Sequence, residues 1–281
     1  MLIQITNRCN FKCIHCMNNC TPDDDNQMTY DDFVRSVQLS RTLNSKVLII
    51  SGGEPTLHRK WVDIVSYACE NMKKVIIATN GWWLVWNKHE SVVQSEMLKL
   101  LAKYDNLNIQ VTSIKDLYVS DSRHLSVEAV CSGASDFKSA LKMRGIKRRF
   151  TIATDRKEIH MTSLGRATEH EELMEEAKKA TSKTTDCFRG CLAGAQTVLP
   201  ITISVLEQHG KFCTPRINCK GEMSWAECWS CPGFASINEP LEVIMLKARS
   251  WRPCGKCADY QKLLDAKTPD YVEAKKILGI K

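Results

Sequence analysis

Residues 8–16 read Arg-Cys-Asn-Phe-Lys-Cys-Ile-His-Cys, and this loop brings three cysteines, Cys9, Cys13 and Cys16, close together. A short apolar run at residues 2–5 directly precedes the loop and is typical of a buried strand. Three thiolates on one loop can hold three irons of a [4Fe-4S] cubane, which leaves the fourth iron open to a ligand that is not protein. The loop therefore predicts a metal site at the end of a first strand.

The cysteine spacing also permits a second kind of site. A zinc knuckle would use the same three thiols and complete its tetrahedron with Cys20 or His15. The choice between iron–sulfur and zinc depends on the segment that follows.

A second buried-strand pattern ends in a glycine-rich turn. Residues 46–50 are rich in β-branched side chains and stop at Ser-Gly-Gly-Glu-Pro, residues 51–55. Two glycines let the backbone come close to a ligand, and Glu54 adds a charge partner for an ammonium group. Alone, the turn would suit an ordinary strand-to-helix connection. After the cysteine loop, it favours a small-molecule site beside an iron–sulfur cluster.

Together, the Cys-x3-Cys-x2-Cys loop and the Gly-Gly-Glu-Pro turn resemble the radical S-adenosylmethionine (radical SAM) enzymes. The resemblance implies that the amino and carboxylate groups of SAM chelate the open iron. An electron from the reduced cluster then cleaves SAM to methionine and a 5′-deoxyadenosyl radical, which abstracts hydrogen from a substrate. It also implies an electron donor such as flavodoxin or ferredoxin.

The resemblance assigns roles to residues along the chain. It implies that the Gly-Gly-Glu-Pro turn binds the SAM amino group, that Ser113 lies near the ribose and that Arg166 bonds the carboxylate through its forked guanidinium. An exposed arginine without a ligand role is the alternative for Arg166. The residues expected to bind SAM are Gly52, Gly53, Glu54, Asn80, Ser113, Arg166 and His15. No residue is assigned as a catalytic acid or base.

Strand and helix patterns alternate along the first part of the chain. Helical spacing follows Thr29, whose hydroxyl is expected to cap a helix, and recurs from Trp61 and from Val92. Such alternation predicts an α/β fold of βαβ units, a partial (β/α)6 TIM-like barrel of radical SAM type with its functional loops at the carboxyl ends of the strands. Further strands are expected at residues 74–78, 108–111 and 149–153.

Eight of the 14 cysteines gather in the last third of the chain. They are Cys187, Cys191, Cys213, Cys219, Cys228, Cys231, Cys254 and Cys257. Cys213, Gly221 and Cys228 resemble the hairpin that opens the SPASM and twitch extensions, which hold auxiliary [4Fe-4S] clusters in radical SAM maturases. We expect a radical SAM core over residues 1–185 and a cysteine-rich region with a terminal helix over residues 186–281.

The chemistry of the C-terminal cysteines is open between two metals. The Cys-x2-Cys pairs at 228/231 and 254/257 also suit a zinc ribbon, and free thiols are a third reading. For a single auxiliary cluster, the expected ligands are Cys213, Cys231, Cys254 and Cys257, with Cys228 as the replacement. For Cys187 and Cys191 two roles remain open. They would either complete a second cluster or lie near the substrate.

The composition is that of a globular protein without a membrane span. Of 281 residues, 43% are hydrophobic and 25% are charged, and no apolar stretch reaches the roughly 20 residues that a transmembrane helix needs. No secretory signal is expected, so the cysteines favour a reducing cytoplasm over a disulfide framework. We expect Cys69 and Cys131 to be buried core thiols and Cys20 to be structural.

Charge and aromatic residues bear on the substrate. The net charge is +7, and the basic run at residues 142–149 suits a phosphate backbone or, more simply, a solvated helix face. Trp82, Trp83 and Trp86 directly follow a strand, where they would line the site or pack in the core.

Three function classes follow from these patterns. The twitch-like cysteines favour a peptide or protein as the substrate. A nucleotide, nucleobase or other small molecule is the alternative, favoured by the basic run and the tryptophans. A non-catalytic, zinc-stabilised nucleic-acid-binding module is the alternative from another class.

Overall fold

The fold is seen in a computed structural model that describes a little over half of the chain. The described residues are 1–14, 16, 18–42, 45–85, 90–112, 127–146, 150–153, 169, 215–225 and 233–250.

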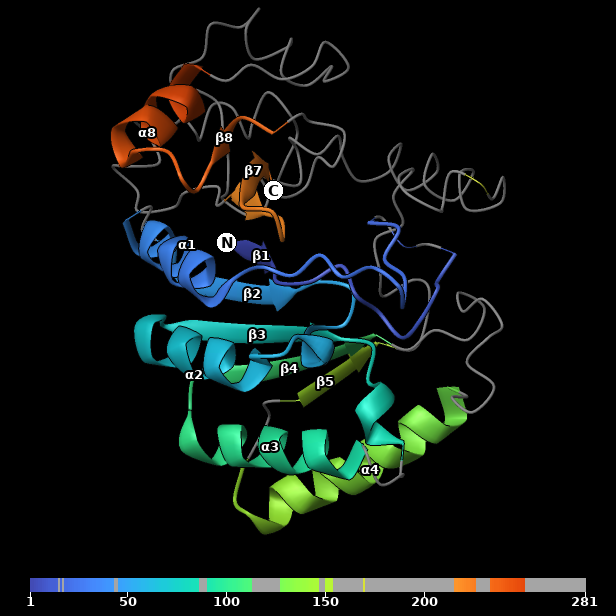
Figure 1. The fold of residues 1–281 in the computed structure, drawn as a ribbon. Coiled ribbons are helices and arrows are strands. Elements are labelled where there is room, and N and C mark those ends of the chain that lie inside the picture. Colours follow the sequence, from blue (N-terminus) through green and yellow to red (C-terminus); the bar gives the residue numbers. More distant parts are fainter. Residues whose placement is uncertain are drawn as a thin grey trace, which may run out of the picture.

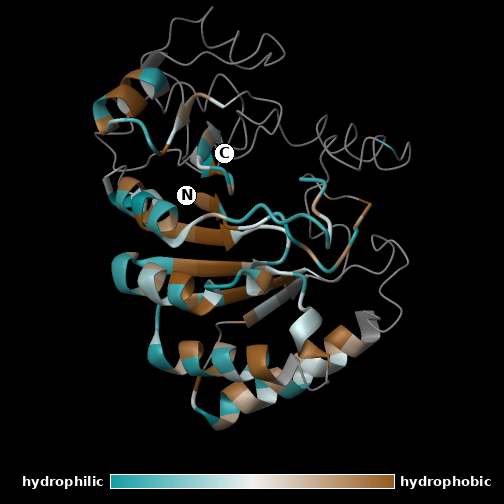
Figure 2. Cartoon of the chain, in the orientation of Figure 1, coloured by the Kyte–Doolittle hydropathy of each residue, from teal (hydrophilic) through white to brown (hydrophobic). Residues whose placement is uncertain are grey.

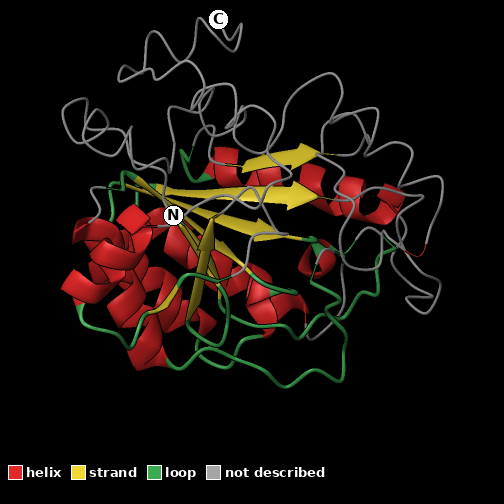
Figure 3. Cartoon of the chain, turned by 90° about the horizontal axis from the view of Figure 1, so that it is seen from above, coloured by secondary structure: helices red, strands yellow, loops and turns green. Residues whose placement is uncertain are grey.

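One mixed sheet organises these residues (Figure 1). Its strands are β1 (Leu2–Gln4), β2 (Val47–Ser51), β3 (Lys74–Thr79), β4 (Leu107–Thr112), β5 (Phe150–Ala153), β6 (Pro215–Ile217), β7 (Glu222–Trp225) and β8 (Ala235–Ser236). They lie in the order β5-β4-β3-β2-β1-β6-β7-β8. All pairs from β5 to β6 are parallel, and only β6–β7 and β7–β8 are antiparallel. Figure 3 shows the twist of successive strands as a fan.

Helices connect the parallel strands. They are α1 (Tyr30–Thr42), α2 (Trp61–Asn71), α3 (Glu90–Lys103) and α4 (Val127–Met143), with α8 (Leu241–Ser250) after β8 and short 3-10 turns η1 (Pro55–Leu57) and η2 (Trp82–Leu84). Thr29 caps α1 as expected, because its hydroxyl accepts the Asp32 N–H at 3.1 Å and donates to the Asp32 carboxylate at 2.8 Å.

The two faces of the sheet differ in polarity. On one face, alternate residues such as Leu48, Ile50, Ile77 and Ile109 are fully buried and form one core with the helices. On the other face most described strand residues are half-buried or exposed, among them Gln110 on β4, whereas Gln4 on β1 and Arg216 on β6 are buried. Figure 2 shows mostly hydrophobic central strands beside helices that carry both hydrophobic and hydrophilic residues.

The five strands expected in the first part of the chain are confirmed, with bounds that differ by at most one residue. The α/β fold of radical SAM type is also confirmed, as a parallel sheet that stays open among the described residues. Helix α4 was missed, although Val130, Ala134, Phe137 and Leu141 repeat at helical spacing and are buried. Its last turn takes up the start of the basic run.

The hairpin expected around Gly221 is present between β6 and β7. Gly221 has φ +78°, a left-handed conformation that glycine adopts at little cost. Because β6 pairs with β1, this hairpin extends the main sheet. The expected boundary at residue 185 lies outside the described residues and stays a prediction.

No helix within the described part of the chain is long and apolar enough to cross a membrane.

Gly133 tests the packing of α4 against η2. A Cβ at this position would overlap the carbonyl group of Leu84. Alanine ordinarily stabilises a helix interior by about 1 kcal/mol over glycine. Here we expect Gly133→Ala to lower the free energy of unfolding by about 2 kcal/mol, because backbone must move to make room. Urea denaturation checks this, with the exposed neighbour Ser132→Ala as a control that should stay near wild type; a stabilised Gly133→Ala would contradict the packing.

Candidate functional site

The cysteine loop leaves the carboxyl end of β1 and folds into a small apolar cluster. Cys9, Phe11 and Cys20 are buried at its centre, and Cys13 and Cys16 pack against them half-buried. The Cys16 N–H donates to the Cys13 carbonyl at 3.1 Å, which closes a turn between these two cysteines. Cys20, expected to be structural, is 1% exposed and contacts the Cys16 thiol. One loop therefore gathers four thiols.

The Gly-Gly-Glu-Pro turn packs directly against this loop. The Gly53 N–H donates to the Thr6 carbonyl at 2.7 Å, and the Glu54 N–H donates to the Arg8 carbonyl at 2.9 Å. A Cβ on Gly53 would overlap the Arg8 carbonyl, and one on Gly52 would lie 2.6 Å from the Thr6 oxygen. The close approach that both glycines allow is thus to the protein's own backbone.

Glu54 is the most enclosed charged group at the site. Its side chain is 0% exposed. One carboxylate oxygen accepts the Thr56 N–H at 3.1 Å and the Thr56 hydroxyl at 2.7 Å, and the other accepts the Asn80 N–H at 2.9 Å. The Thr79 hydroxyl lies 2.9 Å from both oxygens. Glu54 thus joins the turn after β2 to the end of β3.

The environment of Glu54 shifts the pKa of its carboxyl group. Burial raises the pKa of the Glu54 carboxyl, and the hydrogen bonds from Asn80, Thr56 and Thr79 offset this only in part. The sequence predicts that Glu54 is a charge partner for an ammonium group, and this stays a prediction. In the structure its carboxylate is enclosed among protein donors.

Asn80 connects the Glu54 network to the cysteine loop. Its side-chain N–H group donates to the Asn10 amide oxygen at 3.0 Å and to the Cys9 sulfur at 3.8 Å. The Phe11 N–H also donates to this sulfur, at 3.4 Å. Burial raises the pKa of the Cys9 thiol to about 12, and these hydrogen bonds act against the increase.

The donor set fits an iron–sulfur cluster by its chemistry. Three thiols share one loop, apolar side chains surround them, and two N–H groups point at a cysteine sulfur. Within the described ranges, no three cysteine, histidine or acidic side chains already converge on a metal position.

The three tryptophans after β3 fall into different environments. Trp83 is 1% exposed and meets Phe137 edge-on in the core, with ring centroids 5.2 Å apart. Trp82 is half-buried, packs against the cysteine cluster and donates from Nε1 to the Thr56 hydroxyl at 2.9 Å. Of the two expected roles, Trp83 has the core role and Trp82 borders the site. Trp86 lies outside the described residues.

Arg216 on β6 was not identified from the sequence. It is 9% exposed, and its guanidinium donates to the side-chain oxygens of Gln4 and Asn18. Burial lowers the pKa of Arg216 to about 10. The residue ties β6 to β1 and to the segment after Cys16. The only sequence feature that indicated burial of Arg216 was its position in a short strand.

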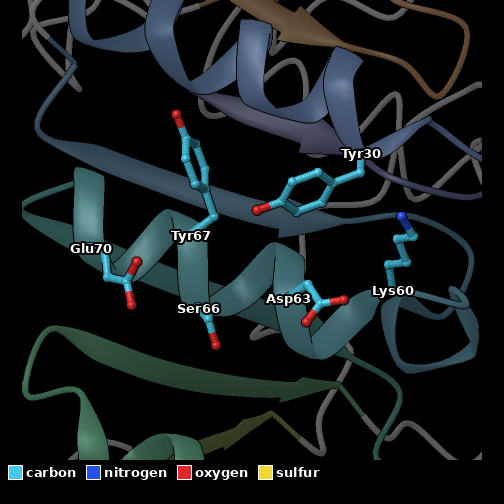
Figure 4. Close-up of a pocket in the computed structure, with 6 residues that line it drawn as sticks. All are labelled: Tyr30, Lys60, Asp63, Ser66, Tyr67 and Glu70. Carbon is cyan, nitrogen blue, oxygen red and sulfur yellow. The ribbon is translucent and has the colours of Figure 1, made fainter.

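A separate shallow cavity of about 330 Å³ lies over α1 and α2 (Figure 4). It is lined by Tyr30, Lys60, Asp63, Ser66, Tyr67 and Glu70. The Lys60 ammonium lies 5.5 Å from the Tyr30 ring centre, a cation–π distance. None of the lining residues comes from the cysteine loop or the glycine-rich turn, so the cavity is distinct from the candidate site.

Many of the predicted site residues lie outside the described residues. They are His15, Ser113, Arg166, Cys187, Cys191, Cys213, Cys228, Cys231, Cys254 and Cys257. Gly52, Gly53, Glu54 and Asn80 do come together with Cys9 at the carboxyl edge of the sheet. Cys69 is buried as expected, whereas Cys131 is half-buried and Cys219 is buried after β6.

Thr79 tests the Glu54 network. Besides Glu54, its hydroxyl bonds the Gly81 N–H and the Trp83 indole N–H, each at 3.1 Å. Thr79→Val keeps the shape but leaves buried polar partners unsatisfied, so we expect a loss of about 2–3 kcal/mol in unfolding free energy. Chemical denaturation measures this, and the same change at Thr151, exposed on β5, is the control. Equal effects at both positions would contradict the network.

His58 predicts a pH dependence. Its Nδ1 accepts the Lys60 N–H at 3.0 Å, so Nε2 carries the hydrogen and donates to the Met28 carbonyl at 2.9 Å. Burial lowers the pKa of His58 below its usual 6.5. As the pH falls through 6.5, His58 takes up a proton in the unfolded chain but stays neutral in the folded chain. The free energy of unfolding therefore decreases.

Two variants isolate this effect. His58→Asn and His58→Gln both remove the titrating group, so the wild-type loss of stability below pH 6.5 should shrink in both, whatever their stability at neutral pH. Urea denaturation over a pH series measures the slopes. Slopes identical to wild type in both variants would show that His58 does not titrate in this window.

Comparison with known proteins agrees with this geometry. The sequence model of the radical SAM superfamily matches residues 3–144. The chain is 30% identical over 106 residues to a probable GTP 3′,8-cyclase of Methanocella arvoryzae, which covers 38% of this chain and 34% of that protein. It is 29% identical over 101 residues to the antilisterial bacteriocin subtilosin biosynthesis protein AlbA of Bacillus subtilis, covering 36% and 20%. The match thus spans about a third or less of these relatives.

The fold has a counterpart among solved structures. The crystal structure of Streptococcus suis SuiB bound to S-adenosylmethionine aligns with a TM-score of 0.50 over 95% of this chain and 74% of that chain, at 15% identity. At this identity the likeness concerns the fold alone. Because the family's sequence model matches half of the chain, including the cysteine loop and the Gly-Gly-Glu-Pro turn, the chain belongs to the radical SAM superfamily and is an enzyme of that kind.

Proposed function

We propose that this enzyme binds a [4Fe-4S] cluster through Cys9, Cys13 and Cys16 and uses it to cleave SAM reductively. The observation that carries the proposal is the direct packing of the glycine-rich turn on the cysteine loop, through the bonds of Gly53 to Thr6 and Glu54 to Arg8. When bound, the cluster supplies the electron for the cleavage and an open iron for SAM.

The chain's own residues then hold and orient the two groups. The three thiols bind the cluster, while Phe11 and Trp82 exclude water from it. The backbone of Gly52 and Gly53 stays next to the loop, where the SAM amino group is proposed to bind. Glu54 keeps that backbone in place from beneath through Thr56, Thr79 and Asn80. For SAM, His15, Ser113 and Arg166 remain the proposed further contacts.

We propose an auxiliary iron–sulfur cluster in the C-terminal region. The proposed ligands are Cys213, Cys231, Cys254 and Cys257, with Cys228 as the replacement. The hairpin between β6 and β7, with Gly221 in its turn, supports this proposal because it starts two residues after Cys213 and ends three before Cys228. The division into a core at 1–185 and a cysteine-rich region at 186–281 belongs to the same proposal.

For the substrate we propose a peptide or protein. The sheet face away from the helices has uncharged polar groups in its described rows nearest the carboxyl edge, including Ser51, Gln110 and Thr151. Amide and hydroxyl groups both donate and accept, as a peptide backbone requires. A nucleoside triphosphate would need exposed cations there, whereas the guanidinium of Arg216, which lies on this face beside Leu2, is 9% exposed and already bonded to Gln4 and Asn18. The likeness to AlbA, a bacteriocin biosynthesis protein, supports the same class.

A nucleotide substrate is the second candidate. Its support is the 30% identity over 106 residues to a probable GTP 3′,8-cyclase. A cytoplasmic location and an electron donor such as flavodoxin or ferredoxin are proposed for either substrate, since the cluster needs reduction and protection from oxygen.

Metal content and SAM cleavage test the proposal. Anaerobically purified protein should contain about four irons for one cluster, or about eight with an auxiliary cluster, with matching sulfide. With dithionite and SAM it should release 5′-deoxyadenosine, measured by chromatography. The Cys9, Cys13 and Cys16 to Ala triple variant should release none. Zinc in place of iron, or release by the triple variant, would refute the assignment.

The same assay separates the substrate classes. Release of 5′-deoxyadenosine should rise above the slow background when the correct substrate is present. We expect stimulation by a mixed peptide library and none by GTP. Stimulation by GTP alone would establish the second candidate and overturn the first.

A further inference from the structure

Asn80 has every polar side-chain atom engaged, and this determines its orientation. Its amide oxygen accepts the Trp82 N–H at 3.0 Å. One side-chain hydrogen goes to the Asn10 oxygen at 3.0 Å, and the other faces the Cys9 sulfur at 3.8 Å. If the Asn80 amide were flipped, its NH2 group would face the Trp82 N–H, donor to donor, and its oxygen would face the Asn10 oxygen, acceptor to acceptor. The donor must therefore point toward Cys9.

The backbone of Asn80 is held as firmly as its side chain. Its N–H donates to the buried Glu54 carboxylate at 2.9 Å. Gly81 follows with φ +79°, and a Cβ there would lie 2.6 Å from a Val111 methyl group. The turn after β3 is thus confined on both sides, and Asn80 cannot withdraw from Cys9 without disturbing Glu54.

The Cys9 sulfur therefore receives two N–H donors within a buried cluster. The Phe11 N–H is a backbone group at 3.4 Å, and the Asn80 amide is the side-chain donor. Hydrogen bonds to cysteine sulfur are one of the means by which a protein sets the potential of an iron–sulfur cluster, because they favour the more negative, reduced state.

We propose that Asn80 is a positioning residue for the radical SAM cluster that raises its reduction potential through the hydrogen bond to Cys9. This inference rests on the proposed function, since it requires that Cys9 binds the cluster. It differs from the role expected from the sequence, in which Asn80 contacts SAM.

Three substitutions test it. Asn80→Ala removes the side-chain donor, and Asn80→Ser replaces it with a hydroxyl on a shorter side chain. Asn80→Asp keeps the acceptor for Trp82 but places a negative oxygen near the sulfur. The cluster potential is measured without SAM by an anaerobic titration followed by electron paramagnetic resonance. We expect the reduction potential of the cluster to be more negative in all three variants than in wild type, with the largest shift in Asn80→Asp. In Asn80→Ala the equilibrium constant for reduction should fall about fivefold.

Asn71→Asp is the matched control. It makes the same change at the end of α2, on the opposite edge of the sheet, where Asn71 bonds Arg41 and the Tyr67 carbonyl. Its potential should equal that of wild type. Iron content and circular dichroism are measured on every variant.

The outcomes separate this inference from the proposed function. A wild-type protein without a cluster refutes the proposed function, and the inference with it. Wild-type potentials in the Asn80 variants with intact clusters overturn only the inference. If all three variants lose the cluster but keep the wild-type circular dichroism, Asn80 is needed for binding rather than for potential, and the inference as stated is also overturned.

Discussion

The carboxyl edge of this sheet depends on one buried carboxylate. Glu54 lies at 0% exposure, where an unpaired charge would be strongly unfavourable, so its oxygens require hydrogen-bond donors from the surrounding chain. Those donors come from η1, through Thr56, and from the end of β3, through Thr79 and Asn80. Satisfying Glu54 therefore sets the relative positions of two turns that are 25 residues apart along the chain, between Glu54 and Thr79.

The cysteine loop is aligned by the same turn from its other side. Gly52 and Gly53 have no side chains to separate the turn from Thr6 and Arg8, and two backbone hydrogen bonds fill the space. The Met28 N–H donates to the Ile5 carbonyl and so brings the loop back beside β1, and His58, the residue after η1, donates from Nε2 to the Met28 carbonyl. Loop, turn and strand end thus form one hydrogen-bonded unit on a rigid sheet, which is how a site is preorganised.

Local pattern predicted much of this arrangement. Each strand from β1 to β5 is a short apolar run with a turn after it, and both features can be recognised from the sequence alone. The burial of Glu54 was not predicted, because it arises from Thr79, a residue whose distance from the turn depends on strand pairing. Arg216 was missed for the same reason, since its partners Gln4 and Asn18 lie about 200 residues earlier. The glycines correctly indicated a close approach, which in the structure is to the chain's own backbone at Thr6 and Arg8, and their expected contact with a ligand stays a prediction.

The chain of bonds from Glu54 to Cys9 has a physical consequence for the site. Asn80 bonds Glu54 through its backbone and Cys9 through its side chain, so a shift of the glycine-rich turn changes the donor geometry at the sulfur. Trp82 adds a parallel route, because it bonds Thr56 and packs on the cysteine cluster. A ligand that presses on the turn would therefore alter the environment of the cysteine loop through groups already in contact, without any larger conformational change.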